Sequence, residues 1–506
     1  MSKILTPKSF QAEIPRASHN LYAERSTTLH PMTLIPIYYR RMMKGDRFNF
    51  GVVESILRSE PTFAPLYSNW RLRFEWYFDS DANRYGWVDN NTRLTSEEVM
   101  NRRHHTYVTN KVSDVQEVLN ERNTIGRGGI ADYAGIAPGF SFTIIDDDIL
   151  GANQKVGDFG SVFNIDFHLS YLNIIRNYHV NKQFPDIPYI AHRADIDAFE
   201  YRQFSLSKLD ELFMMLRSCK NGVQFDLYNS DCNVDSSLNE YYQGVVDAFM
   251  NYLYAAEDSF GGLFCSQYEP DLYQNLLAKD ANLLRATVST AGNGFSVETF
   301  RLANHLQGLY DKIFVSGGTD RELSRAIWGI KSNRDYDIPE LLCVHDEIIG
   351  NNLVVGTASG NASYNGEAVS SIPGSMSGYT NTRRNGKRSQ RFEAKTAGSL
   401  MCLVSLVPIV SYSQNICRHL LENNFMDEFT PDMARKGFEK LPLTDYCALP
   451  DVSGSDSSPV NISQDKLSTV VGTQVAWLRE MTDVNRVHGE FSNGGESEPE
   501  TSGKAQ

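Results

Sequence analysis

The chain has 506 residues, a formal net charge of -14 and an aromatic content of 11%. This acidic balance argues against a protein that binds nucleic acid over its whole surface, although it is compatible with local basic patches. The length allows two or three ordinary domains, but a β-sandwich with long insertions can also form one unit, and the 25 Tyr and 27 Phe residues favour a β-rich protein with large buried or interfacial surfaces.

No segment predicts export or membrane insertion. Residues Met1–Ser18 lack the apolar core of a secretory signal. The most apolar run, Leu400–Val410, is interrupted by Ser405 and Pro408 and is well short of the ~20 residues that span a bilayer. We therefore expect a soluble protein with no membrane partner.

Cysteine usage predicts reduced thiols. There are seven cysteines, they are widely spaced, and they form no C-x-x-C pair: Cys219, Cys232, Cys265, Cys343, Cys402, Cys417 and Cys447. This pattern favours mostly buried thiols in a reducing cytoplasm over a zinc site.

Three segments have the pattern of β-strands. The segment Arg71–Phe78 places apolar side chains at every second position, which predicts a half-buried strand. Segments Phe140–Ile145 and Leu400–Val410 are also strand-like, and Pro408 suggests that the second is an edge strand or carries a bulge. Because long connections separate these strands, we expect a mainly β fold, a sandwich with insertions rather than a regular βαβ array.

One helix is predicted near the middle of the chain. Ser296 is a suitable N-cap, Glu298 in the first turn is favourable for the helix dipole, and Gly317 and Gly318 end the pattern. One face of this helix carries apolar residues at steps of three or four: Phe300, Ala303, Leu306, Tyr310 and Ile313.

Several segments predict insertions. Residues 186–260 have mixed patterns and are the expected place of an inserted subdomain, within which Ala194–Tyr201 and Leu206–Arg217 are possible helices. Segment 356–391 is rich in Gly, Ser and Asn and predicts a flexible surface insertion. Pro450–Asp465 predicts a further surface insertion, and residues 492–506 form a polar tail.

Two polar clusters have a structural and a functional interpretation. Asp146, Asp147 and Asp148 can offer oxygen ligands to a divalent cation, but a calcium loop spaces its ligands at alternate positions, so a solvated acidic turn is favoured. His104 and His105 follow two arginines, and a surface or subunit-contact cluster is favoured over a metal site because adjacent strand residues point to opposite faces.

A basic segment is the candidate nucleic-acid site. Five cations lie within nine residues, in or beside a loop that contains Asn385 and Gly386: Arg383, Arg384, Lys387, Arg388 and Arg391. Such a patch can neutralise DNA phosphates, but a solvated loop or pairing with acidic groups of a neighbouring subunit explains it equally well. A second, weaker basic cluster consists of Arg40, Arg41, Lys44 and Arg47.

Motifs of common enzyme classes are missing. The chain contains no G-x-x-x-x-G-K-[ST] loop, no H-E-x-x-H and no G-x-S-x-G. We therefore expect no enzyme activity, no cofactor and no metal.

Five segments resemble one protein family, in the same order along the chain. The most specific is the C-terminal stretch Val471–Phe491. The others are Leu34–Ile37 with Lys44–Phe48, then Ser266–Tyr273, then Phe295–Thr319 with its Ser-Gly-Gly-Thr turn, and then Leu406–Gln414, which closes on Tyr-Ser-Gln. Together they resemble the major capsid protein of microviruses, the small single-stranded-DNA bacteriophages.

This resemblance implies a structural protein of the virion. The implied fold is a single domain over residues 1–506, an eight-stranded antiparallel jelly-roll sandwich with long loop insertions and a few helices. Identical copies would form a T=1 icosahedral shell around a single-stranded DNA genome, assembled in the cytoplasm of a bacterial host. The implied partners are further copies of the chain, a small basic DNA-binding protein that compensates the genome charge, and a spike or pilot protein.

The chain departs from the family pattern at its C-terminus. After Phe491 it continues as a polar tail, where family members continue into a short aromatic strand. The alternative from another class is a carbohydrate-binding or hydrolytic β-sandwich, which a pocket with suitably separated carboxylates would favour.

Overall fold

In the computed structural model, the described parts of the chain are residues 17–21, 23–29, 32–50, 54–58, 69–86, 103–108, 111–112, 127–136, 144–145, 162–180, 186–192, 199–219, 222–226, 262–265, 338–349, 352–355, 360–364, 367–371, 376–379, 381–385, 390–409, 411–412, 417, 420, 429, 438–442, 470–478, 482–486 and 488. Within these residues the protein is mainly β, with antiparallel sheets and few helices. The predicted fold class is confirmed at this level.

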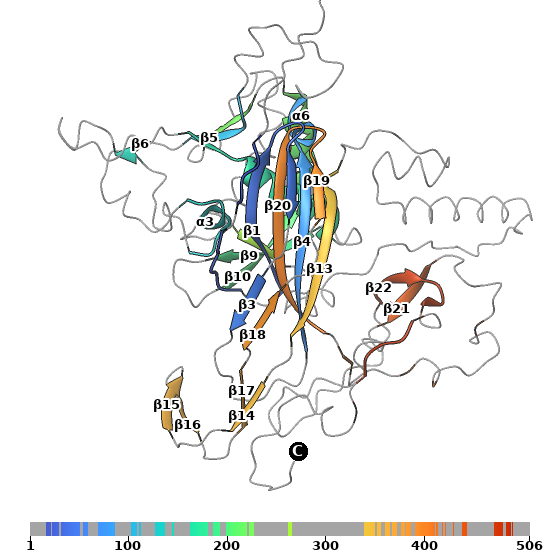
Figure 1. The fold of residues 1–506 in the computed structure, drawn as a ribbon. Coiled ribbons are helices and arrows are strands. Elements are labelled where there is room, and N and C mark those ends of the chain that lie inside the picture. Colours follow the sequence, from blue (N-terminus) through green and yellow to red (C-terminus); the bar gives the residue numbers. More distant parts are fainter. Residues whose placement is uncertain are drawn as a thin grey trace, which may run out of the picture.

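Seven of the described strands form one antiparallel sheet (Figure 1). In spatial order they are β10 (Phe199–Ser205), β9 (Asp186–His192), β12 (Gly262–Cys265), β1 (Thr33–Met42), β20 (Gly398–Pro408), β4 (Trp70–Ser80) and β13 (Glu340–Ile349). The neighbours β1 and β20 are more than 350 residues apart in the sequence. The sheet is therefore built mainly from long-range pairings.

The neighbouring strands β20 and β4 are buried on both faces. In β20, Leu400 and Cys402 belong to one hydrophobic cluster, while Met401 and Leu403 belong to another on the opposite face. The strand predicted over Leu400–Val410 is confirmed. The prediction of an edge strand is wrong, because β20 lies between β1 and β4, and Pro408 is tolerated as the last residue of the strand.

A bulge does occur in the neighbouring strand. The register of β1 against β20 shifts between Pro36 and Tyr38. Proline lacks the backbone N–H that a regular ladder requires, so a bulge is a typical place for it.

Strand β4 confirms the prediction over Arg71–Phe78 but is more buried than predicted. Its residues Leu72, Phe74, Trp76 and Phe78 lie in one cluster, as period-two alternation requires. On the other face Glu75 and Asp79 are also buried. The strand is not half-buried, because helices cover its polar face.

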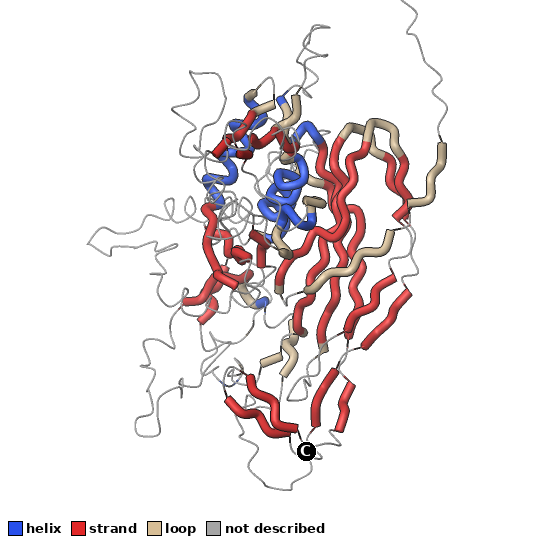
Figure 2. The backbone as a smooth tube through the Cα atoms, turned by 90° about the vertical axis from the view of Figure 1, so that its left-hand side faces the viewer, coloured by secondary structure: helices blue, strands red, loops and turns tan. Residues whose placement is uncertain are grey.

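That helical layer lies on one side of the main sheet (Figure 2). It consists of α5 (Asp166–Ile174), the π-helical turn η4 (Ile175–His179) and α6 (Leu206–Ser218). Every residue of α5 is buried, as expected for a helix that is apolar over most of its surface. The helix predicted over Leu206–Arg217 is confirmed.

Most of the described part of residues 186–260 belongs to the main sheet and the helical layer on it, whereas β11 (Gln224–Asp226) pairs with β5 (Thr106–Val108) in a separate three-stranded sheet. Strands β9 and β10 extend the sheet, and α6 contributes Leu209, Leu212 and Leu216 to its core. The possible helix over Ala194–Tyr201 is wrong for residues 199–201, which are in β10 and pair with β9. Residues 193–198 and 227–261 lie outside the described residues.

Short strand pairs cover the other face of the sheet. Strand β2 (Arg47–Phe50) pairs with β19 (Gln390–Glu393), and β3 (Glu54–Arg58) pairs with β18 (Asn381–Asn385). Phe392 lies with its ring centroid 4.8 Å from that of Phe78, and Phe48 lies 6.2 Å from Trp76. These two pairs therefore form a ribbon whose aromatic side packs on the sheet.

The predicted insertion 356–391 contains regular structure. Its described residues include β15 (Gly360–Tyr364) paired with β16 (Glu367–Ser371), and β17 (Met376–Tyr379) paired with β14 (Asn352–Val355). Both pairs lie at the end of the molecule away from α6 (Figure 1). The absence of apolar alternation in the sequence predicts a loop, whereas the described residues form paired strands.

Smaller elements complete the described structure. They are η1 (Asp81–Asn83), β5 (Thr106–Val108), β6 (Lys111–Val112), α3 (Ile130–Tyr133), β7 (Ile144–Ile145), β8 (Val162–Asn164), β11 (Gln224–Asp226), β21 (Phe438–Pro442) and β22 (Val470–Val475). Strand β7 covers the end of the strand predicted at Phe140–Ile145. No helix among the described residues is long and apolar enough to cross a membrane.

Several predictions fall outside the described residues. These are the acidic run Asp146–Asp148, the helix from Ser296 to Gly317, the insertion Pro450–Asp465 and the tail 492–506.

Candidate functional site

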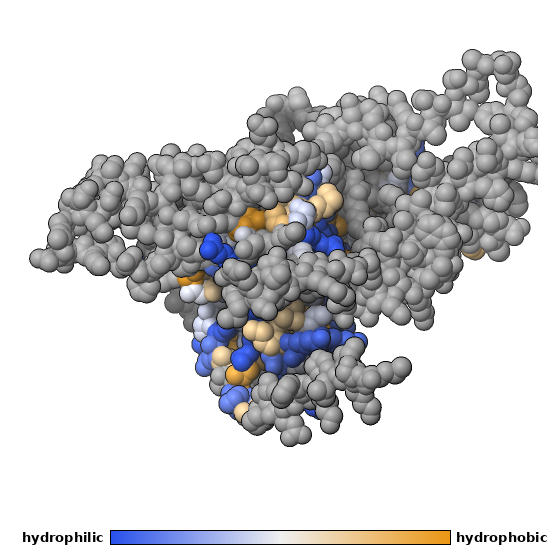
Figure 3. Space-filling view, turned by 90° about the horizontal axis from the view of Figure 1, so that it is seen from above, coloured by the Kyte–Doolittle hydropathy of each residue, from blue (hydrophilic) through white to orange (hydrophobic). Residues whose placement is uncertain are grey.

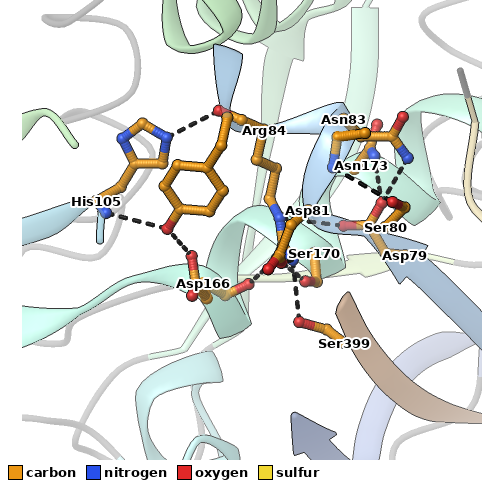
Figure 4. Close-up of polar contacts among 12 residues, drawn as sticks. Asp79, Ser80, Asp81, Asn83, Arg84, His105, Asp166, Ser170, Asn173 and Ser399 are labelled. Atoms are coloured by element: carbon orange, nitrogen blue, oxygen red, sulfur yellow. Dashed lines mark hydrogen bonds and ion pairs between the residues drawn. The ribbon is translucent and has the colours of Figure 1, made fainter. Parts of the chain in front are cut away.

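The site begins where β4 turns away from the sheet. Ser80 caps the turn η1, because its Oγ accepts a hydrogen bond from the backbone N of Ala82 at 3.3 Å. The backbone N of Asp81 donates to the carbonyl oxygen of Ala397 at 3.0 Å, which holds the turn beside the start of β20. The side chains of this turn consequently lie between the sheet and α5 (Figure 4).

Helix α5 presents a polar stripe to this turn. Asp166, Ser170 and Asn173 follow one another at steps of four and three residues, so they lie on one helix face. Asn164 Oδ1 accepts from the backbone N of Asp166 at 2.7 Å, and the carboxylate in the first turn is favourable for the helix dipole. A polar stripe of this kind can be buried stably only if its groups form hydrogen bonds inside the protein.

Arg84 is the centre of the network (Figure 4). Its side chain is completely buried, and Nη2 donates to Asp81 Oδ1 at 2.8 Å and to Ser399 Oγ at 3.1 Å. Nη1 donates to the carbonyl oxygen of Asp166 at 2.8 Å and to Ser170 Oγ. One side chain thus joins the end of β4, the start of β20 and the first turn of α5.

Burial alone lowers the pKa of Arg84, but the surrounding carboxylates outweigh this effect and raise its pKa overall. The guanidinium therefore remains charged, and its burial is tolerated because it is paired and hydrogen-bonded. Removing either partner of such a pair leaves an uncompensated charge in a dry environment.

Asp79 is the innermost carboxylate. Its Oδ1 accepts from Asn83 Nδ2 at 2.9 Å and from Asn173 Nδ2 at 2.8 Å, while its Oδ2 lies 3.5 Å from Arg84 Nε. Those last two atoms form no hydrogen bond of good geometry, so their interaction is an ion pair only. Burial raises the pKa of Asp79, and Arg84 and the two amides only partly oppose this.

Asp166 receives donors from three different parts of the chain. Arg41 Nη1 of β1 lies 2.7 Å from its Oδ2, His104 Nδ1 lies 3.1 Å from the same atom, and the Tyr85 hydroxyl donates to its Oδ1. Burial raises the pKa of Asp166, but the hydrogen bond from His104 and the charge of Arg84 outweigh this and hold it well below its usual range.

His105 lies inside this network and not on the surface. Its ring stacks on Tyr85 with centroids 4.3 Å apart, and its Nδ1 accepts from the backbone N of Val223 at 3.0 Å. Nε2 then carries the proton and donates to the carbonyl oxygen of Arg84 at 2.9 Å. His105 is fully buried, so the prediction of a surface cluster at His104 and His105 is wrong for His105. Burial also lowers the pKa of His105 to about 4.

A second carboxylate lies further along the same sheet face. Glu75 of β4 accepts from the Tyr77 hydroxyl at 2.7 Å, lies 2.6 Å from Arg73 Nε and lies 3.1 Å from His179 Nε2 at the end of η4. Burial raises the pKa of Glu75, but the hydrogen bond and charge of His179, with Tyr77 and Arg73, lower it overall.

A similar pair occurs on the opposite face. His345 Nε2 lies 3.1 Å from Glu347 Oε1 on β13, and Ser55 Oγ of β3 donates to Glu347 Oε2 at 2.7 Å. This contact attaches the ribbon to the edge of the sheet.

The predicted basic segment does not form a loop patch in its described part. Arg383 and Arg384 are in β18, opposite Ile56 and Ser55 of β3, and Arg391 is in β19, opposite Asn49. Consecutive strand positions alternate between faces, so positions 383 and 384 lie on opposite faces of the ribbon. Lys387 and Arg388 lie outside the described residues.

The second basic cluster is also divided. Arg41 is bound within the buried network, 2.7 Å from Asp81 Oδ2, whereas Arg47 pairs with Glu393 at 2.8 Å on the exposed ribbon. Arg40 and Lys44 are exposed. Hydrophilic and hydrophobic side chains lie side by side on the described part of the face seen in Figure 3.

No sequence motif identifies Arg84, Asp79 or Asp166, because the residues of a buried polar network have no fixed spacing in the sequence. Two signals in the sequence do point to it. Polar residues alternate with aromatic ones in β4, and the spacing of Asp166, Ser170 and Asn173 places a polar stripe on an otherwise apolar helix.

The network is suited to holding structure together. Its carboxylates are directed at internal donors, and their side chains are at most 2% exposed in Asp79, Asp81 and Asp166. Within the described residues, no group of three or more His, Cys, Asp or Glu side chains is arranged to hold a metal ion.

No protein-family model matches the chain, and no curated protein matches it.

Proposed function

We propose that this chain is the major capsid protein of a microvirus-like particle, which self-assembles into an icosahedral shell around single-stranded DNA. The observation that carries the proposal is how the fold groups the segments with family resemblance. The segment beginning at Leu34 lies in β1 beside the segment beginning at Leu406, and the backbone N of Met32 donates to the carbonyl oxygen of Leu406 at 2.8 Å.

The C-terminal segment joins the same group. Tyr412 forms a parallel bridge with Arg486, and its backbone N donates to the carbonyl oxygen of Asn485 at 2.8 Å. Three segments that resemble one family from distant parts of the sequence are thus in contact. Chance similarities at unrelated positions would have no reason to meet in this way.

The finer fold follows from the same proposal. The main sheet and the ribbon of β2, β3, β18 and β19 supply two β layers with a hydrophobic cluster between them, as a jelly roll requires. We infer an eight-stranded jelly roll whose connections are lengthened into helices and peripheral strand pairs.

Exposed apolar residues are suited to contacts between subunits. Leu341, Val344 and Ile348 are exposed along β13, and Leu420 and Val484 are exposed near the C-terminal segment. Exposed large apolar side chains mark interaction sites in soluble proteins where they gather in a patch. In a shell, neighbouring subunits would bury it.

The partners follow from charge. A net charge of -14 makes the chain poorly suited to compensate an enclosed genome by itself. A small basic DNA-binding protein would provide this charge, and a spike or pilot protein would complete the virion. The alternative of a carbohydrate-binding or hydrolytic β-sandwich has less support for its hydrolytic form, because the described buried carboxylates are occupied by internal donors.

The test is assembly. Purified protein, alone and with its partner proteins, should form closed particles of uniform diameter in negative-stain electron microscopy, and light scattering after size exclusion should give a mass far above 57.1 kDa. A protein that remains monomeric under every assembly condition would contradict the proposal.

A further inference from the structure

The segment before β1 lies outside the regular structure of the protein. We call residues 17–29 the arm, and its described residues, 17–21 and 23–29, lie in no helix, strand or turn. All of these residues except Leu29 are exposed, and they include the apolar Leu21, which is 41% exposed. Holding such a segment in one conformation costs conformational entropy, which only its contacts can offset. The position of the arm therefore depends on a small number of contacts.

The strongest of these contacts lie at the end of the arm next to β1. Leu29 packs against both hydrophobic clusters of the main sheet, so it lies where the two clusters meet. Thr27 Oγ1 lies 2.7 Å from the hydroxyl of Tyr133 in α3, and this hydroxyl donates to the carbonyl oxygen of Thr28 at 3.4 Å. Both threonines are exposed, so water competes for these hydrogen bonds.

A third contact joins the arm to β1. The guanidinium carbon of Arg25 lies 5.4 Å from the ring centroid of Tyr38. Arg25 is exposed, and a cation–π contact at an exposed position is weak. Within the described part of the chain, no backbone–backbone hydrogen bond involves the arm. The arm is therefore attached by side chains and not by a β ladder.

A hinge separates the arm from the sheet. Met32 has a φ of 64°, in the left-handed region that residues other than glycine, asparagine and aspartate seldom adopt. Its backbone N is fixed by the carbonyl oxygen of Leu406 at 2.8 Å, and the next residues, Thr33 and Leu34, are 1% exposed. A change of backbone dihedrals at such a boundary redirects the segment before it and leaves β1 in place.

We propose that the arm exchanges between copies of this chain, so that in the assembly it docks on Tyr133 and Tyr38 of a neighbouring copy. The proposal rests on the proposed capsid function only in requiring that copies of the chain meet. Exchange preserves the contacts of the arm, because the neighbouring copy offers the same two tyrosines and the same clusters for Leu29. A segment of about 15 residues spans up to about 50 Å, which is sufficient to cross a subunit boundary. Leu21 would then lie between two copies, where its apolar surface is buried.

Cross-linking between chains tests the exchange. Chains with Thr27→Cys and chains with Tyr133→Cys are mixed before assembly and treated with a short bismaleimide, which spans the space that the tyrosine ring leaves. Each chain carries only one of the two new thiols, so a product that joins positions 27 and 133 is a covalent dimer. Exchange holds these thiols at an effective concentration on the order of millimolar, against micromolar for free chains, so we expect such dimers to form at least about a hundredfold faster than in a control pair.

The control pair is Thr27→Cys with Met214→Cys. Met214 of α6 is 62% exposed and takes part in none of the contacts of the arm. Mass spectrometry of the cross-linked peptides separates the new thiols from the native cysteines. If Tyr133→Cys does not fold, a photo-reactive benzophenone amino acid in place of Ser26, in a tagged chain mixed with untagged parent, should label Tyr133 or Tyr38 peptides of the untagged chain.

The outcomes separate the exchange from the capsid function. Shells that form without covalent dimers, while a chain carrying both Thr27→Cys and Tyr133→Cys cross-links within itself, would overturn the exchange and leave the capsid function standing. Dimers that join positions 27 and 133 without any shell would support the exchange and count against the capsid. If neither dimers nor shells form, both proposals are wrong.

Discussion

At the scale of single residues, Arg84 supplies positive charge that compensates the buried carboxylates of Asp79 and Asp81. It is completely buried and interacts with two carboxylates, two serine hydroxyls and a backbone carbonyl. A buried guanidinium is not by itself a source of stability, because desolvation offsets most of the attraction. Its removal is nevertheless costly, because the carboxylates around it would remain.

We therefore expect Arg84→Met to reduce the free energy of unfolding by about 3–5 kcal/mol, measured by urea denaturation near pH 7. Methionine fills similar space but leaves Asp79 without its cation and Asp81 paired with Arg41 alone. The control is Arg40→Met on the exposed side of β1, which should change stability by no more than about 0.5 kcal/mol. A similar small change for Arg84→Met would show that the carboxylates do not depend on it.

The two adjacent histidines illustrate a limit of sequence reasoning at the same scale. His104 and His105 are adjacent, yet one pairs with Asp166 while the other is stacked on Tyr85 with a lowered pKa. Both residues lie just before β5, outside any strand, so strand alternation does not apply to them, and both rings contact Tyr85. Which of the two is buried depends on the packing of Tyr85, Asp166 and Val223 around them.

At the scale of elements, close contact between β20 and β4 requires a glycine. Gly398 pairs with Ser80, and a Cβ at this position would lie 2.4 Å from the carbonyl oxygen of Asp79 and 2.8 Å from Phe78 Cζ. The backbone cannot move without disturbing the turn η1 that carries the network.

Gly398→Ala should accordingly destabilise the protein by about 1–3 kcal/mol and increase hydrogen exchange at η1, because overpacking forces backbone shifts. The exposed neighbour Lys395→Ala, in the turn before β20, serves as the control for a change in this part of the chain. Unchanged thermal stability of Gly398→Ala would mean that the two strands can separate locally without cost.

Elements with strong local patterns are those that the sequence predicts. Segments 71–78, 206–217 and 400–410 have clear two-residue or helical periodicity, and each forms the expected element. Residues 381–385 and 360–364 form strands without such a pattern, and they pair with β3 and β16. At residues 199–201 pairing with β9 similarly overrides a weak helical tendency.

At the scale of the whole molecule, the role of the basic segment depends on which face of the ribbon each of its cations occupies. Position 383 shares the face of exposed Ile56, and Arg391 is exposed beside Asn49. Position 384 shares the face of Ser55, which contacts Glu347 on the sheet. DNA contacts, if the proposed capsid function is right, therefore require positions 383 and 391 more than 384.

Replacing Arg383, Arg384, Lys387, Arg388 and Arg391 by Gln should lower genome retention and make particles more salt-sensitive. Each DNA phosphate that the variant no longer binds should reduce the slope of log affinity against log salt by about 0.7 for single-stranded DNA. The pair Arg383→Gln and Arg391→Gln should reproduce most of the effect, whereas Arg217→Gln, at an exposed position of α6, should not. If the variant with all five substitutions packages DNA normally and resists salt as the parent does, the segment is only a solvated part of the ribbon and does not contact DNA.

The sequence by itself determines the mainly β composition, the central strands and one helix, because alternation and helical spacing are local properties of the chain. It also carries the resemblance from which a capsid function is proposed. The tertiary structure alone decides which polar residues become interior. Glu75 and Asp79 occupy the polar face of an alternating strand, a pattern that ordinarily faces water, and they are buried because a helix about 90 residues later covers that face with its own polar stripe. Burial and pairing of these groups are properties of two surfaces that meet, so neither segment predicts them alone.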